Sequence, residues 1–122
     1  MNREARERYY GERAEEFRKY TAVFAVSDYY AVDVMYFLLG RGFAVPGDIS
    51  VIGFDGSALS RAVRPRLTTV AQDMRTRAAK AIEYLLAIRE DQRRSVTEVL
   101  PVKLVLRESS RACYQKARQE TF

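Results

Sequence analysis

The chain has 122 residues, a length that fits one domain or part of one, and 48% of its residues are apolar. That apolar share is enough for a folded core and excludes a disordered chain. The formal net charge is +5, from 21 basic and 16 acidic residues. Much of the excess lies near the two ends, so we interpret it as solvated helix surface and not as a nucleic-acid-binding surface.

Two residue types limit the chemistry that the chain can perform. Cys113 is the single cysteine, so no disulfide can form within the chain and a reducing compartment is favoured. Histidine is absent, which removes histidine-based triads and metal sites. The N-terminal segment is too charged for a signal peptide, and no apolar stretch reaches the ~20 residues of a membrane helix. We therefore expect a cytoplasmic protein with no membrane partner, metal or cofactor.

The first half of the chain predicts a helix, a strand and a second helix. Residues 3–20 predict a leading helix with Tyr10 and Phe17 on one face, and we assign residues 1–20 to this leading segment. We expect the helix to pack on the sheet that follows. Residues 22–26 have the apolar content of a strand. Residues 28–41 predict a helix that is apolar nearly all round, capped by Ser27 or Asp28, so it should be covered on more than one side.

The second half predicts two more strands and a third helix. Residues 49–54 are continuously apolar, which favours a parallel strand buried on both faces. An irregular loop at 56–66 leads to a strand at 67–71 and a helix at 74–90, which carries an apolar face of Ala78, Ile82, Leu85 and Leu86. A polar turn (91–95), an extended segment (96–108) and a tail (112–122) complete the chain. Pro101 places the extended segment at a sheet edge.

Each of the three predicted strands stops at a polar residue. Asp28 follows the first strand, Asp55 the second and Gln72 the third. In a parallel sheet these ends share one edge, which is where open α/β folds bind ligands. The sequence therefore predicts a polar ligand-binding rim. The six glycines form neither a dinucleotide fingerprint nor a P-loop, so phosphate cradling is unsupported.

The rim residues allow more than one interpretation. Asp28 and Asp55 resemble a pair that could hold Mg²⁺, but each also suits a helix cap or a turn. A carboxylate beside the neutral amide of Gln72 fits a polyhydroxylated ligand better than a phosphate, because the amide both donates and accepts hydrogen bonds. Tyr29 could stack on a sugar-like ring, and Met74 could supply an apolar contact or pack in the first helical turn.

Four segments together resemble the LacI/GalR family of bacterial transcriptional regulators: TAVFAVSD (21–28), GFAVPGDISVIGFD (42–55), LTTVAQ (67–72) and LPVKLVLRES (100–109). The resemblance covers about residues 21–111. It implies an α/β fold with a parallel sheet. This fold would be a Rossmann-like lobe of a type I periplasmic-binding-protein-like domain, and the lobe would be incomplete in this chain. Ser27 stands where many members have Asn.

The resemblance also implies a function and a site. Family members bind a small molecule, usually a sugar, between two lobes, form homodimers and bind operator DNA through a headpiece that this chain lacks. Asp28 is implied to bond ligand hydroxyls, Gln72 to lie near the ligand and Met74 to contact it. The loop at 57–66 matches part of the family's dimer interface, which predicts interface residues Ser57, Ser60, Val63 and Arg64.

The leading hypothesis is the ligand-sensing and dimerising segment of a LacI-type regulator, which is not an enzyme. One alternative is a sugar-binding transport or receptor protein on the same fold, and upstream sequence would separate the two. The other is a small α/β enzyme that uses Asp28 and Asp55 with Mg²⁺.

Overall fold

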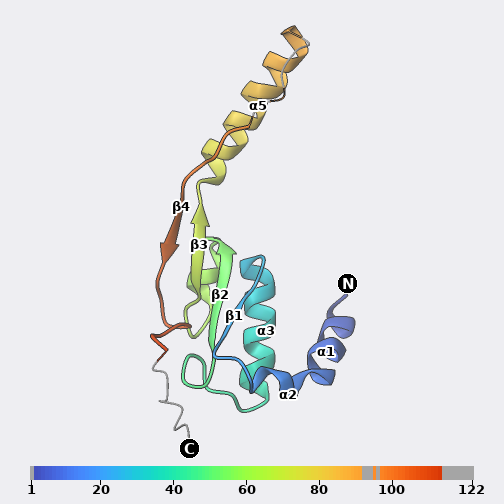
Figure 1. The fold of residues 1–122 in the computed structure, drawn as a ribbon, viewed down its shortest axis with the longest axis vertical. Coiled ribbons are helices and arrows are strands. Elements are labelled where there is room, and N and C mark those ends of the chain that lie inside the picture. The colour runs from blue at the N-terminus through green and yellow to red at the C-terminus, as the bar shows by residue number, and fades with distance from the viewer. Residues whose placement is uncertain (1, 92–94, 96, 114–122) are drawn as a thin grey trace, which may run out of the picture.

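The computed structural model describes residues 2–91, 95 and 97–113, so most of the predicted turn at 91–95 and of the predicted tail at 112–122 lies outside the described residues. Nine elements follow one another along these residues (Figure 1). In chain order they are α1 (Arg3–Glu12), α2 (Ala14–Phe17), β1 (Ala22–Phe24), α3 (Asp28–Gly40), β2 (Ser50–Asp55), α4 (Leu59–Ala62), β3 (Thr68–Gln72), α5 (Met74–Asp91) and β4 (Val102–Val105).

The four strands form one sheet in the order β1-β2-β3-β4. β1, β2 and β3 run parallel, and β4 pairs with β3 in the antiparallel direction. The predicted parallel sheet is therefore confirmed, and so is the edge position of the last strand. Pro101, which lacks a backbone N–H, lies directly before β4 and outside its ladder.

Helix α3 covers one face of the sheet and supplies half of the buried apolar residues of the core. Met35 and Leu38 of α3 are fully buried, as are Val51 of β2 and Leu67 before β3. Ser27 caps the helix, because its hydroxyl oxygen accepts a hydrogen bond from the Tyr30 backbone N–H at 3.3 Å. Ser27 was one of the two residues predicted to cap this helix.

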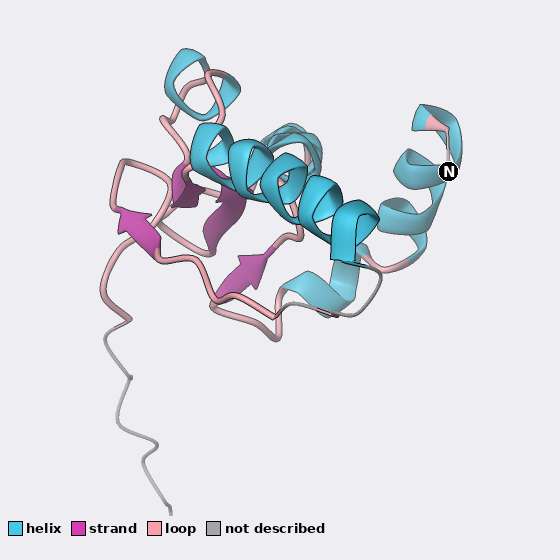
Figure 2. Cartoon of the chain, turned by 90° about the horizontal axis from the view of Figure 1, so that it is seen from above, coloured by secondary structure: helices cyan, strands magenta, loops and turns pink. Residues whose placement is uncertain are grey.

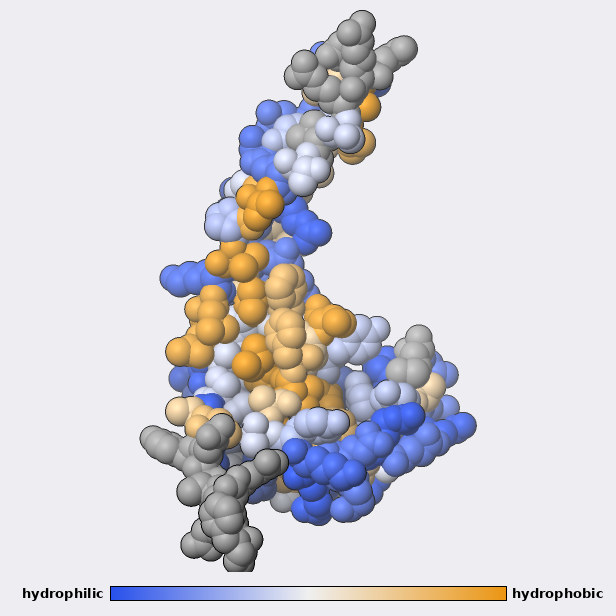
Figure 3. Space-filling view, viewed as in Figure 1, coloured by the Kyte–Doolittle hydropathy of each residue, from blue (hydrophilic) through white to orange (hydrophobic). Residues whose placement is uncertain are grey.

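The opposite face of the sheet is open to solvent in this chain. Phe24 of β1 is 63% exposed, and its neighbours on that face, Ile52 and Phe54 of β2, are only partly buried. Figure 3 looks onto this face and shows apolar side chains spread over the sheet and onward along α5. The prediction that the second strand is buried on both faces is therefore wrong for this chain.

The leading segment differs from its prediction in two ways. It forms two helices, because α1 ends after Gly11, a poor helix former, and the Arg13 N–H bonds to the Tyr10 carbonyl at 3.2 Å. It also packs on α3 and not on the sheet, through the rings of Tyr10 and Phe37, whose centroids are 5.4 Å apart. Helix α3 thus lies between the sheet and α1, as its all-round apolar sequence predicts.

A buried ion pair fastens α1 to α3. The Arg6 Nε atom lies 2.7 Å from the Asp33 Oδ2 atom, and only 5% of Arg6 is exposed. The neighbouring Asp33 carboxylate raises the pKa of Arg6 above its ordinary value. A buried pair of this kind fixes one orientation of the two helices.

Helix α5 projects from the carboxyl end of the sheet (Figure 1), and in the view from above it lies in front of the strands (Figure 2). Its predicted apolar face is solvent-exposed, with Ile82 at 60% and Leu85 at 67%. None of the described helices is both long enough and apolar enough to cross a membrane. The loop predicted at 56–66 contains the short helix α4.

Candidate functional site

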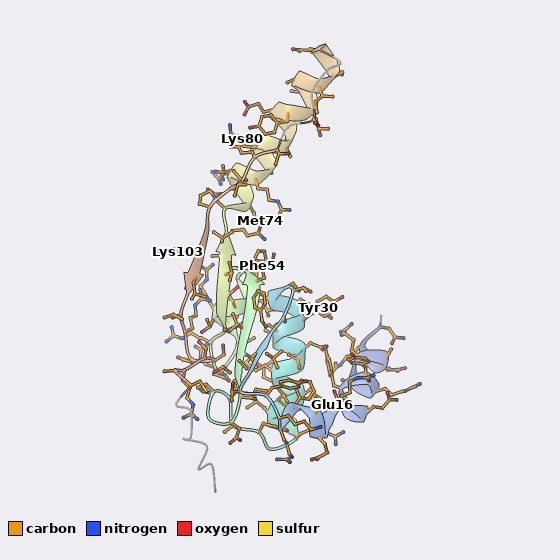
Figure 4. The ribbon with its side chains drawn as sticks, in the orientation of Figure 1. Glu16, Tyr30, Phe54, Met74, Lys80 and Lys103 are labelled. Atoms are coloured by element: carbon orange, nitrogen blue, oxygen red, sulfur yellow. The ribbon has the colours of Figure 1, made fainter. Side chains whose placement is uncertain are left out.

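The polar residues that end the three parallel strands lie at one edge of the sheet. Asp28 is the first residue of α3, shortly after β1, while Asp55 and Gln72 are the last residues of β2 and β3. Figure 4 shows Phe54 and Met74 at this junction between the sheet and α5. The predicted geometry of neighbouring strands that point the same way is therefore present.

Asp28 is buried beneath the rim, with 1% of its surface exposed. Its Oδ2 atom accepts hydrogen bonds from the Ser57 backbone N–H and hydroxyl, both at 2.7 Å. Its Oδ1 atom accepts one from the Thr69 hydroxyl at 2.5 Å. Both oxygens thus bond to protein atoms, and the carboxylate links α3, the β2–α4 loop and β3. A direct bond from Asp28 to a ligand stays a prediction, and this geometry does not favour it.

The same contacts weaken the magnesium alternative. A cation at Asp28 and Asp55 would have to displace hydrogen bonds from Ser57 and Thr69, and hard cations need six or more oxygen ligands. Among the described residues, no group of three acidic or cysteine side chains could hold a metal ion.

Asp55, Gln72 and Arg77 form a hydrogen-bonded chain at the surface of the rim. The Gln72 Nε2 atom donates to the Asp55 Oδ1 atom at 3.1 Å. The Gln72 Oε1 atom accepts from the Arg77 guanidinium at 2.7 Å. Asp55 and Gln72 are partly exposed and Arg77 is exposed, so all three are open to a solute at this edge.

The backbone at Asp55 is strained. Its φ angle is +115°, the one positive φ of a non-glycine residue in the described chain, and Gly56 follows at +73°. A Cβ atom on Gly56 would lie 2.6 Å from the Ala71 Cβ atom, so only glycine fits there. Strain of this kind costs about 1–3 kcal/mol and tends to occur at functional sites.

Tyr29 is held toward the leading helix in this structure. Its hydroxyl accepts a hydrogen bond from Arg6 at 3.1 Å, and the Arg6 guanidinium lies 5.4 Å from its ring centre. Its predicted contact with a ligand is untested. Met74, also proposed as a contact, opens α5 and is 55% exposed, which leaves its thioether free to touch a solute.

A cavity of about 620 Å³ is lined by residues of α1 and α3, beside the contact between these helices, and by Leu59 of α4. Its lining combines aromatic and charged side chains, among them Arg3, Tyr10, Tyr29, Asp33, Tyr36 and Arg41. Tyr29 lines this cavity, whereas Asp55 and Gln72 do not. The cavity is therefore separate from the rim.

The predicted interface residues divide into inward-facing and outward-facing ones. Ser57 bonds to Asp28, Ser60 is fully buried and Val63 is 7% exposed, so these three hold the chain's own structure together. Arg64 is exposed and donates to the Val63 carbonyl at 2.9 Å. Of the four, Arg64 is the one exposed side chain, and the interface stays a prediction.

The sequence analysis missed two residues whose side chains bond to the predicted site residues. Thr69 was interpreted only as a β-branched residue of a strand. Its place in the strand that ends at Gln72 could have marked its hydroxyl as a partner for Asp28. Arg77 is one of 21 basic residues, and only the turn of α5 beside Gln72 distinguishes it.

Comparisons with known proteins match this region of the chain. Residues 1–110 match the model of the family described as periplasmic binding protein-like domain. The transcriptional regulator GalR of Escherichia coli K12 is 43% identical over 93 residues, which is 75% of this chain and 27% of GalR. The chain thus spans about a quarter of the length of that curated relative.

Two solved structures share the fold. The lac repressor dimer bound to operator and the anti-inducer ONPF superposes with a TM-score of 0.68 at 34% identity, over 75% of this chain and 32% of that one. A LacI-family regulator from Arthrobacter sp. FB24 in complex with lactose gives 0.66 at 33% identity, over 89% and 40%. These homologues are transcriptional regulators, which are not enzymes.

Proposed function

The chain belongs to the periplasmic-binding-protein-like family and is homologous to the GalR and LacI regulators, and we propose that it is the sugar-sensing segment of such a regulator. The observation that carries the proposal is the Asp55–Gln72–Arg77 hydrogen-bonded chain at the carboxyl ends of β2 and β3. Open α/β sheets bind ligands at this edge, and carboxylate and amide groups suit sugar hydroxyls.

In this proposal Asp55 and Gln72 bind the ligand's hydroxyls, and Met74 packs against its apolar face. Among the described residues, the Asp55 Oδ2 atom receives no hydrogen bond and is free to accept one. Asp28, buried directly below, positions the rim, and its bond to a ligand and that of Tyr29 are secondary proposals. The lactose complex of the Arthrobacter regulator supports a sugar as the ligand class.

Regulation would follow from differential affinity. A ligand that binds one arrangement of two lobes better than another shifts the population between them, and DNA affinity follows. We assign no DNA contact to these residues, because the alignments cover the effector-binding region. A cytoplasmic homodimer, with Arg64 near its interface, fits the family.

Binding can be tested on this chain by titrating monosaccharides at millimolar concentration and following assigned amide signals by NMR. We expect shifts at Asp55, Gln72 and Met74, and a loss of at least tenfold in affinity in Asp55→Asn. The matched control is Glu16→Gln, which also removes one carboxylate but lies at the opposite end of the molecule (Figure 4). No shifts at the rim, or equal effects of the two substitutions, would refute the sugar site.

A further inference from the structure

Arg77 is a cation at the rim to which the proposed sugar site assigns no ligand group. It lies in the first turn of α5 and is exposed, and the one hydrogen bond of its side chain among the described residues is to Gln72 Oε1 at 2.7 Å. No carboxylate pairs with it among the described residues. Farther along the same helix, Lys80 does have a partner, because its Nζ atom lies 3.4 Å from Glu83.

The contact with Arg77 fixes the orientation of the Gln72 amide. A guanidinium can only donate, so the oxygen Oε1 must face Arg77 and the nitrogen Nε2 must face Asp55. The site therefore has a defined polarity, from a carboxylate acceptor at Asp55 to a cationic donor at Arg77. A guanidinium carries five N–H donors, and the bond to Gln72 uses one of them.

We propose that the ligand of this rim is an acidic carbohydrate, whose hydroxyl binds Asp55 and whose carboxylate or phosphate group binds Arg77. The proposal rests on the sugar-binding function proposed above. Arginine pairs with both anions through two parallel hydrogen bonds, which are about twice as strong as neutral ones. A neutral sugar would leave the remaining Arg77 donors to water.

The surroundings of Arg77 favour an anion at this position. The first turn of a helix carries a partial positive charge, which adds to that of the guanidinium. The acid directly before the helix, Asp73, accepts a hydrogen bond at each carboxylate oxygen, one from the Thr76 backbone N–H at 3.0 Å and one from the Thr76 hydroxyl at 2.7 Å. Asp73 therefore satisfies the helix end and leaves Arg77 available to a ligand.

The test compares three related sugars on the 122-residue chain by the same NMR titration: galactose, galacturonate and galactose 6-phosphate. We expect an acidic sugar to bind at least tenfold more tightly than galactose, and the better of the two identifies the acid as carboxylate or phosphate. Arg77→Gln should remove that preference, so that neither acidic sugar binds more tightly to the variant than galactose does. Arg77→Lys keeps the positive charge but loses the paired N–H donors of the guanidinium. This variant should therefore retain part of the preference for the acidic sugar.

The control is Arg75→Gln, which removes the same charge from the same helical turn, at a residue without a bond to Gln72. It should change the acidic-sugar preference less than twofold. The inference is overturned if galactose binds as tightly as both acidic sugars, or if Arg75→Gln and Arg77→Gln have equal effects, which indicates unspecific attraction. If none of the sugars shifts the rim signals, the proposed function itself fails and the inference with it.

Discussion

Asp28 organises the rim without lying on its surface. Its three hydrogen bonds join α3 to the β2–α4 loop and to β3, so the ends of the parallel strands are held at a fixed spacing. The backbone of β2 must approach closely for this, since a Cβ atom on Gly53 would lie 2.5 Å from Asp28 Oδ1. Glycine at 53 and aspartate at 28 are thus two parts of one arrangement.

We expect Asp28→Ala to lower the free energy of unfolding by about 3 kcal/mol, because the buried Thr69 hydroxyl and the partly buried donors of Ser57 lose a charged acceptor. Urea unfolding followed by circular dichroism measures the change. Asp48→Ala is the matched control, since the Asp48 carboxylate is exposed and accepts one recorded bond, from Ala44 N–H at 2.7 Å, and should cost about 1 kcal/mol.

The two roles considered for Asp28 give different results in this experiment. A structural role predicts a large loss of stability. A direct role in binding predicts unchanged stability with a loss of sugar affinity, and that result would restore Asp28 as a ligand contact.

At the scale of elements, the sequence predicts best where a pattern is periodic and local. The strands, helix α3 and helix α5 follow from apolar runs and caps, and the parallel order follows from their alternation. The break between α1 and α2 was missed because Gly11 lies within a pattern that otherwise continues. The contact of α1 with α3 was missed because a helix face does not specify its partner.

The candidate site was predictable only in outline. Strand ends indicate which residues lie at one edge, so Asp55 and Gln72 could be named from sequence. Whether a side chain points into the protein or out of it depends on tertiary partners, which is why the burial of Asp28 and the role of Arg77 could not be inferred. The orientation of the Tyr29 side chain toward Arg6 also depends on a tertiary partner, so it could not be inferred either.

Helix α5 packs little against the rest of the described chain, so we expect it to depend on Asp73, the residue that directly precedes it. Hydrogen bonds from the Thr76 backbone N–H and hydroxyl lower the pKa of Asp73 below its ordinary value. A depressed pKa means that the stabilisation is fully present above the unfolded value of about 4 and is lost as the pH falls through the folded value.

We therefore expect the helix content of the chain to fall as the pH drops below about 4. Circular dichroism at 222 nm from pH 7 to pH 2 measures this. Asp73→Asn isolates the effect, because Glu108 also has a lowered pKa, owing first to the Arg66 backbone N–H, and titrates in the same range. If the variant and the parent chain lose helix equally, the capping carboxylate does not govern α5.

At the scale of the whole molecule, the dominant feature is an apolar surface that the chain itself does not cover. It includes Phe24, Val102 and Leu104 on the sheet, each more than half exposed, and it continues onto α5 through Ile82 and Leu85. Figure 3 shows the two parts in one view. Contiguous exposed apolar area of this kind marks an interaction surface. The relatives that this chain matches are more than twice as long, which gives them additional chain to cover it.

We accordingly expect the isolated chain to associate through this surface, because burying apolar area releases about 25 cal/mol per Å². Sedimentation velocity over a hundredfold range of concentration should show the average mass rising with concentration. Leu104→Lys should shift the chain toward monomer, since it places a charge on the uncovered sheet face, at the edge strand β4. Tyr20→Lys is the control, because Tyr20 is 58% exposed but precedes β1 and lies off the sheet. Equal association of both variants would place the contact elsewhere, with the loop that carries Arg64 as the next surface to test.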